Sequence, residues 1–470
     1  KTVMLKIDNS KIILFLSLFI YLLPIALISG PAIPDIIISI CGIIYLANIF
    51  LRKKKNINFN IYIIIIFIWC VYLIISSLVS NNFLFSLENS LFFSRFFIFA
   101  FLISFIIQKN LNFLRIFTII LISTLVIVSF DSLLQFFYGY NSLGFVMPDD
   151  LSGKGRVSGF FRSELILGSF LVRLFPLSIG LLIYNFSFAR NFKIYLIFLI
   201  ALFNISIFIS GERSALFYCI LSNIIMLILV NRFIFQILIS NFITLIIILF
   251  LTSYNLDLKN RIFNYTFNQL NILQIIDDVK KIDNDAVELI FNKDQLLDNE
   301  KNTKNNYLFN NIIFFSEENE VFFYKSLKIF NSNKIFGIGP KMYRLECSKD
   351  SYLVDIHLLN AISEKKKMSH GCNTHPHNIY LQLFTETGII GSIPIVLFFF
   401  YIIYSILLIF INNILLRKKN KHLDLEIFIL ISLLIPLWPL IPTGSFFNNW
   451  LSVINFLCLG FFIFIKTQKK

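Results

Sequence analysis

Apolar runs of about 20 residues recur along the whole chain, and they constrain its fold more than any other feature. Each run is long enough to cross the ~30 Å hydrocarbon core of a membrane as a helix. The chain is 57% hydrophobic and has a mean hydropathy of +0.78. Because lipid offers no partners to backbone polar groups, spanning segments of this kind must be helical. We therefore predict an all-α, polytopic membrane protein.

Twelve of these runs are predicted to be membrane spans. They cover residues 11–29, 32–50, 61–80, 91–107, 114–137, 163–183, 194–210, 214–230, 234–252, 388–411, 426–441 and 447–465. No small-residue cleavage site follows the first run, so we interpret it as a retained span and not as a signal peptide.

The basic residues fit one orientation of these spans. With the N-terminus inside and the spans alternating, the inner segments carry 19 of the 41 Lys and Arg residues. The short outer loops near 30–34, 81–90 and 442–449 carry none. The positive-inside rule then predicts that both termini are cytoplasmic. This topology also explains the net charge of +14, so we expect membrane lipids as partners and no nucleic acid.

One long polar stretch divides the chain into three parts. Residues 1–252 hold the first nine spans, residues 253–376 form a large outer loop, and residues 377–470 hold the last three spans. The loop has as many acidic as basic residues, and it is too long to be a simple connection. Its first half, residues 253–315, is typical of a linker.

The second half of this loop carries a helical pattern in residues 317–331. Phe322, Phe323, Leu327 and Phe330 recur there at helical spacing. The pattern predicts an amphipathic helix that lies on the membrane or on the protein itself.

The cysteines indicate a disulfide in the loop. Four of the six fall in spans, where a thiol serves as an ordinary apolar side chain. Cys347 and Cys372 are in the outer loop, where an oxidising compartment favours a bridge between them. Two unpaired thiols are the alternative.

Six basic residues do not fit inner-face anchoring. They are Arg95, Lys154, Arg156, Arg162, Arg173 and Arg213. Cations at a membrane edge are costly, so a functional role is the first interpretation. The arginine fork suits a phosphate or pyrophosphate. Internal ion pairing with the nearby Glu164 and Glu212 is the alternative. We expect Arg95 and Arg173 either to form structural ion pairs or to approach the same anion from behind the residues that bind it directly.

The stretch THPHNIYLQLFTETGIIG places polar side chains densely at a membrane edge. His377 and Asn378 are predicted to begin a helix, with Pro376 tolerated in its first turn. The spacing of Gly388 and Gly391 favours close approach of another helix. A neutral histidine here can act as a general base; a hydrogen-bonded, purely structural His377 is the alternative.

The neighbouring histidines allow a different interpretation. His370, Cys372, His375 and His377 are close enough in sequence to be zinc ligands, although their spacing matches no standard site. His375 precedes a proline, which favours an extended backbone and a supporting role. The chain also lacks the GxxxxGK[ST] phosphate loop, so we expect the energy for any reaction to come from the substrate.

The combination of these segments resembles the bacterial O-antigen ligase and O-antigen polymerase family, inner-membrane glycosyltransferases with a GT-C type of architecture. The family pattern is His, then Asn or a similar residue, nine residues, and Gly-x-x-Gly. His377, Asn378, Gly388 and Gly391 match it fully. The family also has an arginine followed four positions later by leucine. Arg213 matches, but position 217 is Phe.

This resemblance implies a specific reaction at the periplasmic face. A glycan would pass from undecaprenyl pyrophosphate to lipid A–core, with inversion at the anomeric carbon and without metal or cofactor. Arg213 would hold the pyrophosphate with help from Arg156, and His377 would deprotonate or orient the acceptor hydroxyl. Further candidate substrate-binding residues are Arg162, Glu164, His375 and Asn378.

Two other functions stay open. A polymerase of the same family would transfer the growing glycan to another lipid-linked repeat unit. A transporter of a lipid-linked glycan would need polar groups along a path through the membrane, for which Asp131 is the main candidate.

Overall fold

The computed structural model describes residues 9–51, 61–148, 156–264, 266, 317–352, 372–416 and 421–468. The regular elements in these ranges are helices, apart from one isolated bridge between Tyr140 and Val146. Nine of the described helices are long and apolar enough to cross a membrane, and two shorter apolar helices accompany them. The predicted all-α, polytopic fold is therefore confirmed.

Nine helices precede the long polar stretch. They are α1 (Asn9–Ala26), α2 (Ala32–Leu51), α3 (Ile61–Leu78), α4 (Phe83–Lys109), α5 (Asn112–Tyr138), α6 (Leu167–Phe186), α7 (Phe192–Ile209), α8 (Arg213–Leu229) and α9 (Ile234–Tyr254). The described residues beyond them add α10 (Leu256–Lys259), α14 (Glu317–Ser332), α15 (Tyr343–Glu346), α18 (Ile379–Leu416), α19 (Lys421–Leu434) and α20 (Asn449–Gln468). Each predicted span overlaps one of these helices.

Several predicted span ends differ from the helix ends, and two of these differences bear on the polar segments singled out in the sequence. Helix α6 begins at Leu167 and not at residue 163, because a turn precedes it in which Arg162 adopts φ 57° and the Glu164 amide donates to the Phe161 carbonyl. Helix α18 begins at Ile379, within two residues of the helix start predicted at His377 and Asn378 but earlier than the span predicted over 388–411, and Gly388 interrupts it with non-helical angles.

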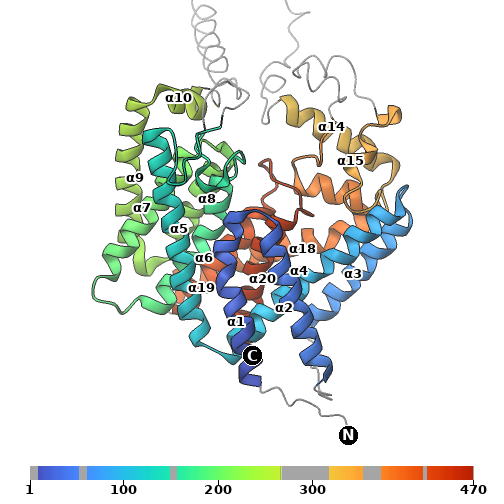
Figure 1. Cartoon of the computed structure of the whole chain (residues 1–470), viewed down its shortest axis with the longest axis horizontal. Helices are drawn as coiled ribbons and strands as arrows, with labels where there is room; N and C mark the ends of the chain where they lie inside the picture. The colour runs from blue at the N-terminus through green and yellow to red at the C-terminus, as the bar shows by residue number, and fades with distance from the viewer. Residues whose placement is uncertain are drawn as a thin grey trace, which may run out of the picture.

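The helices form one bundle with distinct ends (Figure 1). Helices α10, α14 and α15 lie at one end, which we call the cap end, and the C-terminus lies at the other. Segments far apart in sequence pack together: α20 lies against α4, and α19 against α6. Aromatic rings fill much of the α4–α20 contact; the Phe93 ring, for example, lies 5.7 Å from that of Phe456.

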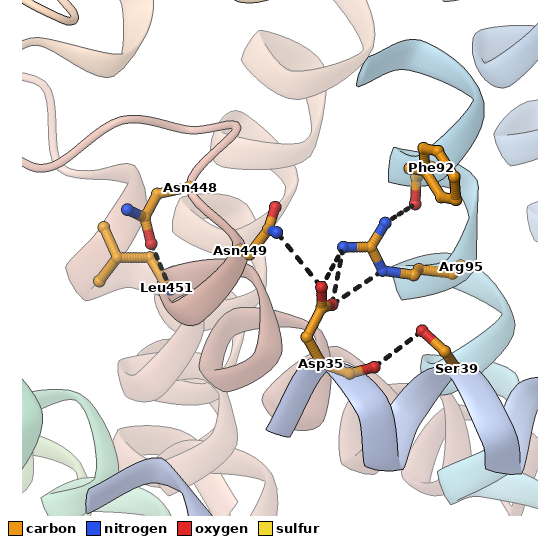
Figure 2. A network of polar contacts seen from close by, with 7 residues as sticks. All are labelled: Asp35, Ser39, Phe92, Arg95, Asn448, Asn449 and Leu451. Atoms are coloured by element: carbon orange, nitrogen blue, oxygen red, sulfur yellow. Dashed lines mark hydrogen bonds and ion pairs between the residues drawn. The ribbon is translucent and has the colours of Figure 1, made fainter. Parts of the chain in front are cut away.

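An ion pair near the cap end ties three helices together (Figure 2). The Arg95 guanidinium on α4 contacts both carboxylate oxygens of Asp35 on α2, at 2.7 and 2.8 Å. The Asn449 amide on α20 donates to the same carboxylate at 3.3 Å. Arg95 is therefore a structural cation, which is one of the two roles expected for it.

The amphipathic helix of the loop is confirmed as α14, but its predicted buried face is partly wrong. It packs on α18, and Leu327 is exposed while Lys325 and Ser326 are fully buried. The Lys325 ammonium donates to the Cys347 carbonyl at 2.9 Å. The Ser326 hydroxyl lies 2.9 Å from that of Thr385 on α18. These hydrogen bonds compensate for the burial of polar side chains, so apolar spacing alone could not identify the face.

Candidate functional site

The segment before α18 is held in place from both sides. Cys372 forms a disulfide with Cys347, and the Cα atoms are 5.3 Å apart. The His377 carbonyl accepts a hydrogen bond from the Thr443 amide at 2.8 Å. His377 also has φ 54°, a conformation that side chains other than glycine seldom adopt. Such a conformation persists only where the surroundings fix it, and it often marks a functional position.

Asn378 serves as the N-cap of α18. Its side-chain oxygen accepts from the amides of Tyr380 and Leu381 at 3.0 and 3.1 Å, and its amide donates to the Pro439 carbonyl at 2.8 Å. The side chain is buried and does not line the cavity described below. The geometry thus favours a role in positioning His377 over the substrate contact predicted for Asn378.

The two histidine rings lie together, with centroids 4.3 Å apart. His377 Nε2 is 2.9 Å from the Asn373 amide nitrogen, and His375 Nδ1 is 3.0 Å from the Thr374 hydroxyl. A donating Asn373 amide leaves Nε2 of His377 unprotonated. Burial and the neighbouring His377 lower the pKa of His375 to about 3, so His375 is neutral at physiological pH.

A cavity of about 1570 Å³ opens beside these rings. Its wall includes parts of α1, α5, α6, α8 and α14, together with residues 442–445. Of the predicted site residues, the cavity brings together four: Arg162, Glu164, His375 and His377. Arg162 and Glu164 are exposed at its edge, and the Arg162 guanidinium lies 4.9 Å from the Phe145 ring centre.

The remaining predicted arginines gather at the turn before α8. Arg213 is the first residue of α8 and is exposed, and the Arg156 Nε atom lies 3.5 Å from the Ser210 carbonyl. Arg261, just after α10, donates to the Gly211 carbonyl at 3.1 Å. Gly211 has φ 69°, and a Cβ there would lie 3.1 Å from the Arg261 side chain. The sequence pattern had not indicated Arg261.

Three guanidinium groups around a helix N-terminus can bind an anion. The amides of the first turn and the helix dipole favour negative charge, and each arginine adds forked donors. None of the three lines the cavity, although Ser214, the neighbour of Arg213, does. Lys154 and His370 lie outside the described residues.

Glu212, one of the two proposed partners of these arginines, is directed mainly towards α6. Its carboxylate accepts from the amides of Gly168 and Ser169 at 2.8 and 3.1 Å, and from the Ser169 hydroxyl at 2.8 Å. It therefore caps α6. Burial raises the pKa of Glu212, against the opposing effects of Ser169 and Arg156. Glu164, the other proposed partner, forms no ion pair within the described ranges.

Of the two glycines of the motif, Gly391 lies against another helix as predicted, and Gly388 does not. Gly388 adopts φ 67° and ψ −173°, and its closest neighbours are backbone atoms of Ile335 and Gly337, which do not belong to a helix. The Gly391 carbonyl accepts from the Trp69 indole of α3 at 2.7 Å. Glu386, between His377 and the kink, accepts from the amides of residues 341 and 343. The motif thus anchors α18 at two places.

The described residues bear on two of the alternatives, the zinc site and the transport path. No group of three or more His, Cys, Asp or Glu side chains is arranged there to hold a metal ion. Asp131 accepts hydrogen bonds from the Ser142 amide and hydroxyl and from Asn141, so it anchors the turn after α5. This structural role accounts for an acidic residue within a span, so the position of Asp131 does not require a transport path.

Fold and site together define a polytopic helical membrane protein with a histidine-bearing cavity and a nearby arginine cluster at one end of the bundle. Residues 195–399 match the family model described as O-antigen ligase. The match includes Arg213, Arg261, His377 and Gly388. No curated protein matches the sequence. The family supports a glycosyltransferase-like enzyme of the ligase or polymerase type, with lipid-linked glycan and lipid A–core as its general substrates.

Proposed function

We propose that the protein is an O-antigen ligase that transfers a glycan from undecaprenyl pyrophosphate to lipid A–core at the periplasmic face of the inner membrane. The observation that carries this proposal is the cavity that His377 and His375 line together with Arg162 and Arg173. One side of the cavity is apolar, which suits a lipid-linked substrate. The proposal puts the cap end and the loop on the periplasmic side, with residues 1–252 and 377–470 as the membrane part.

The reaction is a single displacement. The acceptor hydroxyl oxygen attacks the anomeric carbon of the glycan as the bond from that carbon to the pyrophosphate oxygen breaks. The hydroxyl proton passes to Nε2 of His377, which gives up its hydrogen bond from the Asn373 amide, and the electron pair leaves with undecaprenyl pyrophosphate. Attack from the face opposite the leaving group inverts the anomeric centre.

The leaving group needs charge stabilisation, which arginines can supply without a metal ion. Arg213, with Arg156 and Arg261 around the same turn, is the proposed source. Arg162 and Glu164 at the cavity edge are proposed contacts for the glycan or acceptor, and neutral His375 is proposed to support His377. Transfer should therefore persist in excess chelator; a loss that one specific divalent metal restores would contradict this assignment.

The test is complementation of a deletion strain, read out by lipopolysaccharide profiling. Wild type should restore polymer on lipid A–core, and His377→Ala should lower transfer by ~10²-fold or more, the usual scale for loss of a general base. His422→Ala, in α19, is the matched control, because His422 lies beside Tyr184 and does not line the cavity.

The profile also separates the proposed ligase from its alternatives. A strain lacking the ligase accumulates lipid-linked polymer and has none attached to the core. A core that carries a single repeat unit instead would show a polymerase and overturn the ligase assignment. Normal activity in His377→Ala would overturn the assigned base.

A further inference from the structure

Two buried polar atoms on the wall of the same cavity have no hydrogen-bond partner among the described residues. They are Arg173 Nε and Tyr218 Oη. Buried polar atoms in folded proteins nearly always have a partner, and an orphaned one needs an explanation. Their presence on one cavity wall indicates that a polar ligand completes the site.

Arg173 has the greater need of such a ligand. It lies in α6 with only 4% of its surface exposed. One terminal nitrogen donates to the Ser169 carbonyl at 3.3 Å, and no carboxylate of the described residues forms an ion pair with it. The nearby Glu212 is already occupied in capping α6. A buried cation with so little compensation is costly, so it is a site for an anion.

Tyr218 presents a donor to the same space. It lies in α8 with 2% of its surface exposed, and its hydroxyl has no partner within the described ranges. Tyr218 is five residues into α8 and Arg173 is six residues into α6. At 1.5 Å per residue, both are about 7–9 Å below the cap-end starts of their helices. The pair therefore lies deeper in the bundle than Arg213.

Another part of the cavity wall is apolar and lies at the outer surface of the bundle. Ile25 of α1 and Ile119 and Ile127 of α5 line it, and each has half or more of its surface exposed. Ile28 and Ile120 continue the same wall. An anion between this wall and Arg173 can carry a hydrocarbon chain that leaves along α1 and α5.

We propose that Arg173 and Tyr218 bind the diphosphate of a polyprenyl-linked substrate, whose chain lies along the α1–α5 wall. This inference rests on the proposed function for the choice of lipid. The donor fits better than the acceptor, because its chain is joined directly to the diphosphate beside the reacting carbon. In lipid A–core, the acyl chains are separated from the accepting sugar by other sugars. Arg213 then contacts the same anion from the cap end.

The test measures binding by the purified full chain, without acceptor. The probes are undecaprenyl pyrophosphate, inorganic pyrophosphate and phosphatidylglycerol. Arg173→Met should weaken binding of the polyprenyl probe about 10- to 100-fold, as expected for lost charge-assisted hydrogen bonds. Tyr218→Phe should weaken it about 2- to 10-fold. Arg115→Met, an exposed arginine of α5 that does not line the cavity, should bind as wild type.

Stability separates this role from a structural one. Removing an unpaired buried cation should leave the melting temperature of the unliganded protein unchanged or raise it, whereas loss of a structural ion pair would lower it. If Arg173→Met does not fold, Tyr218→Phe decides, since it removes only the orphaned hydroxyl. Wild-type affinity in Tyr218→Phe would then overturn the proposal.

The other probes test the source of the anion. Inorganic pyrophosphate that binds as tightly as the polyprenyl form would show that the apolar wall contributes nothing. Phosphatidylglycerol that competes equally would show an ordinary phospholipid site; either result overturns the proposal. The proposed function fails separately: a chain that binds undecaprenyl pyrophosphate through Arg173 but transfers no glycan would overturn the ligase assignment and leave this site intact.

Discussion

Replacement of Gly388 by alanine should be among the most damaging single-methyl changes in the protein. Gly388 interrupts α18 with φ 67° and ψ −173°, a region that is essentially restricted to glycine. A Cβ at this position would overlap the carbonyl group of Ile335 and lie 2.7 Å from the Gly337 amide nitrogen. All of these neighbours are backbone atoms, so no side chain can rotate away.

The magnitude follows from two costs. Holding a non-glycine residue in this conformation costs about 1–3 kcal/mol. Forcing a methyl group into a packed site costs about 1–3 kcal/mol more. We expect Gly388→Ala to destabilise the protein by roughly 2–6 kcal/mol and to abolish transfer, because detachment of residues 335–337 also releases the part of α18 that begins at His377.

Two control variants isolate the causes. Gly139 has φ 82°, and a Cβ added there would meet nothing within 4 Å, so Gly139→Ala should cost only the backbone strain, about 1–2 kcal/mol. Gly42 lies within α2, and a Cβ there meets Ile98 at an ordinary 3.5 Å. Gly42→Ala should therefore be neutral or stabilise by up to about 1 kcal/mol.

The assay is thermal unfolding in detergent with a thiol-reactive dye. The four free cysteines, of which Cys41, Cys219 and Cys458 are buried, become accessible as the bundle opens. The expected order of melting temperatures is Gly42→Ala at or above wild type, then Gly139→Ala, then Gly388→Ala. The steric reasoning would be refuted if Gly388→Ala had the same melting temperature as Gly139→Ala and retained transfer.

Three further outcomes are expected. Arg213→Ala should lower transfer ~10²–10³-fold while the protein still folds, and Arg213→Lys should retain part of it; wild-type transfer by Arg213→Ala would contradict the role. Because the pKa of His375 is about 3 in the folded state and ~6.5 in the unfolded state, the free energy of unfolding should fall as the pH drops from about 6.5 to about 3. The melting temperature of His375→Asn should depend less on pH in that window than that of wild type, and the same dependence in both proteins would count against this prediction. Cys372→Ser should cost roughly 3–4 kcal/mol by opening a 25-residue loop, and mass spectrometry without reductant should find the Cys347–Cys372 peptide, a result that free thiols would contradict.

The sequence predicted the helices well because spans are specified locally. A run of about 20 apolar residues in lipid has few alternatives to a helix. The same holds for α14, where helical spacing was correct but the choice of buried side chains was not. Lys325 and Ser326 are buried because they find partners on Cys347 and Thr385, which are distant in sequence.

The candidate site was predictable in its residue types and less so in its contacts. An arginine at a short outer turn and a histidine at a helix start are visible in the sequence. Arg261 was missed because it lies in residues 253–315, a range typical of a linker, and because its contact with the Gly211 carbonyl joins residues 50 positions apart. The unpaired state of Arg173 was equally hidden, since it depends on Glu212 turning towards α6.

The position of His377 is set from several sides, and this explains why the proposed catalytic motif includes distant glycines. At its start, α18 is tied to the 439–443 loop through Asn378 and the Thr443 amide. At its kink, Gly388 receives residues 335–337. The Phe322 ring of α14 lies 5.5 Å from the His377 ring, and α14 is itself bound to α18 and to the disulfide-linked segment. As the proposed base, a histidine fixed in this way would need little rearrangement to meet an acceptor hydroxyl. The proposed contribution of α14 and the disulfide-linked segment is then to hold the histidine without touching the reacting atoms.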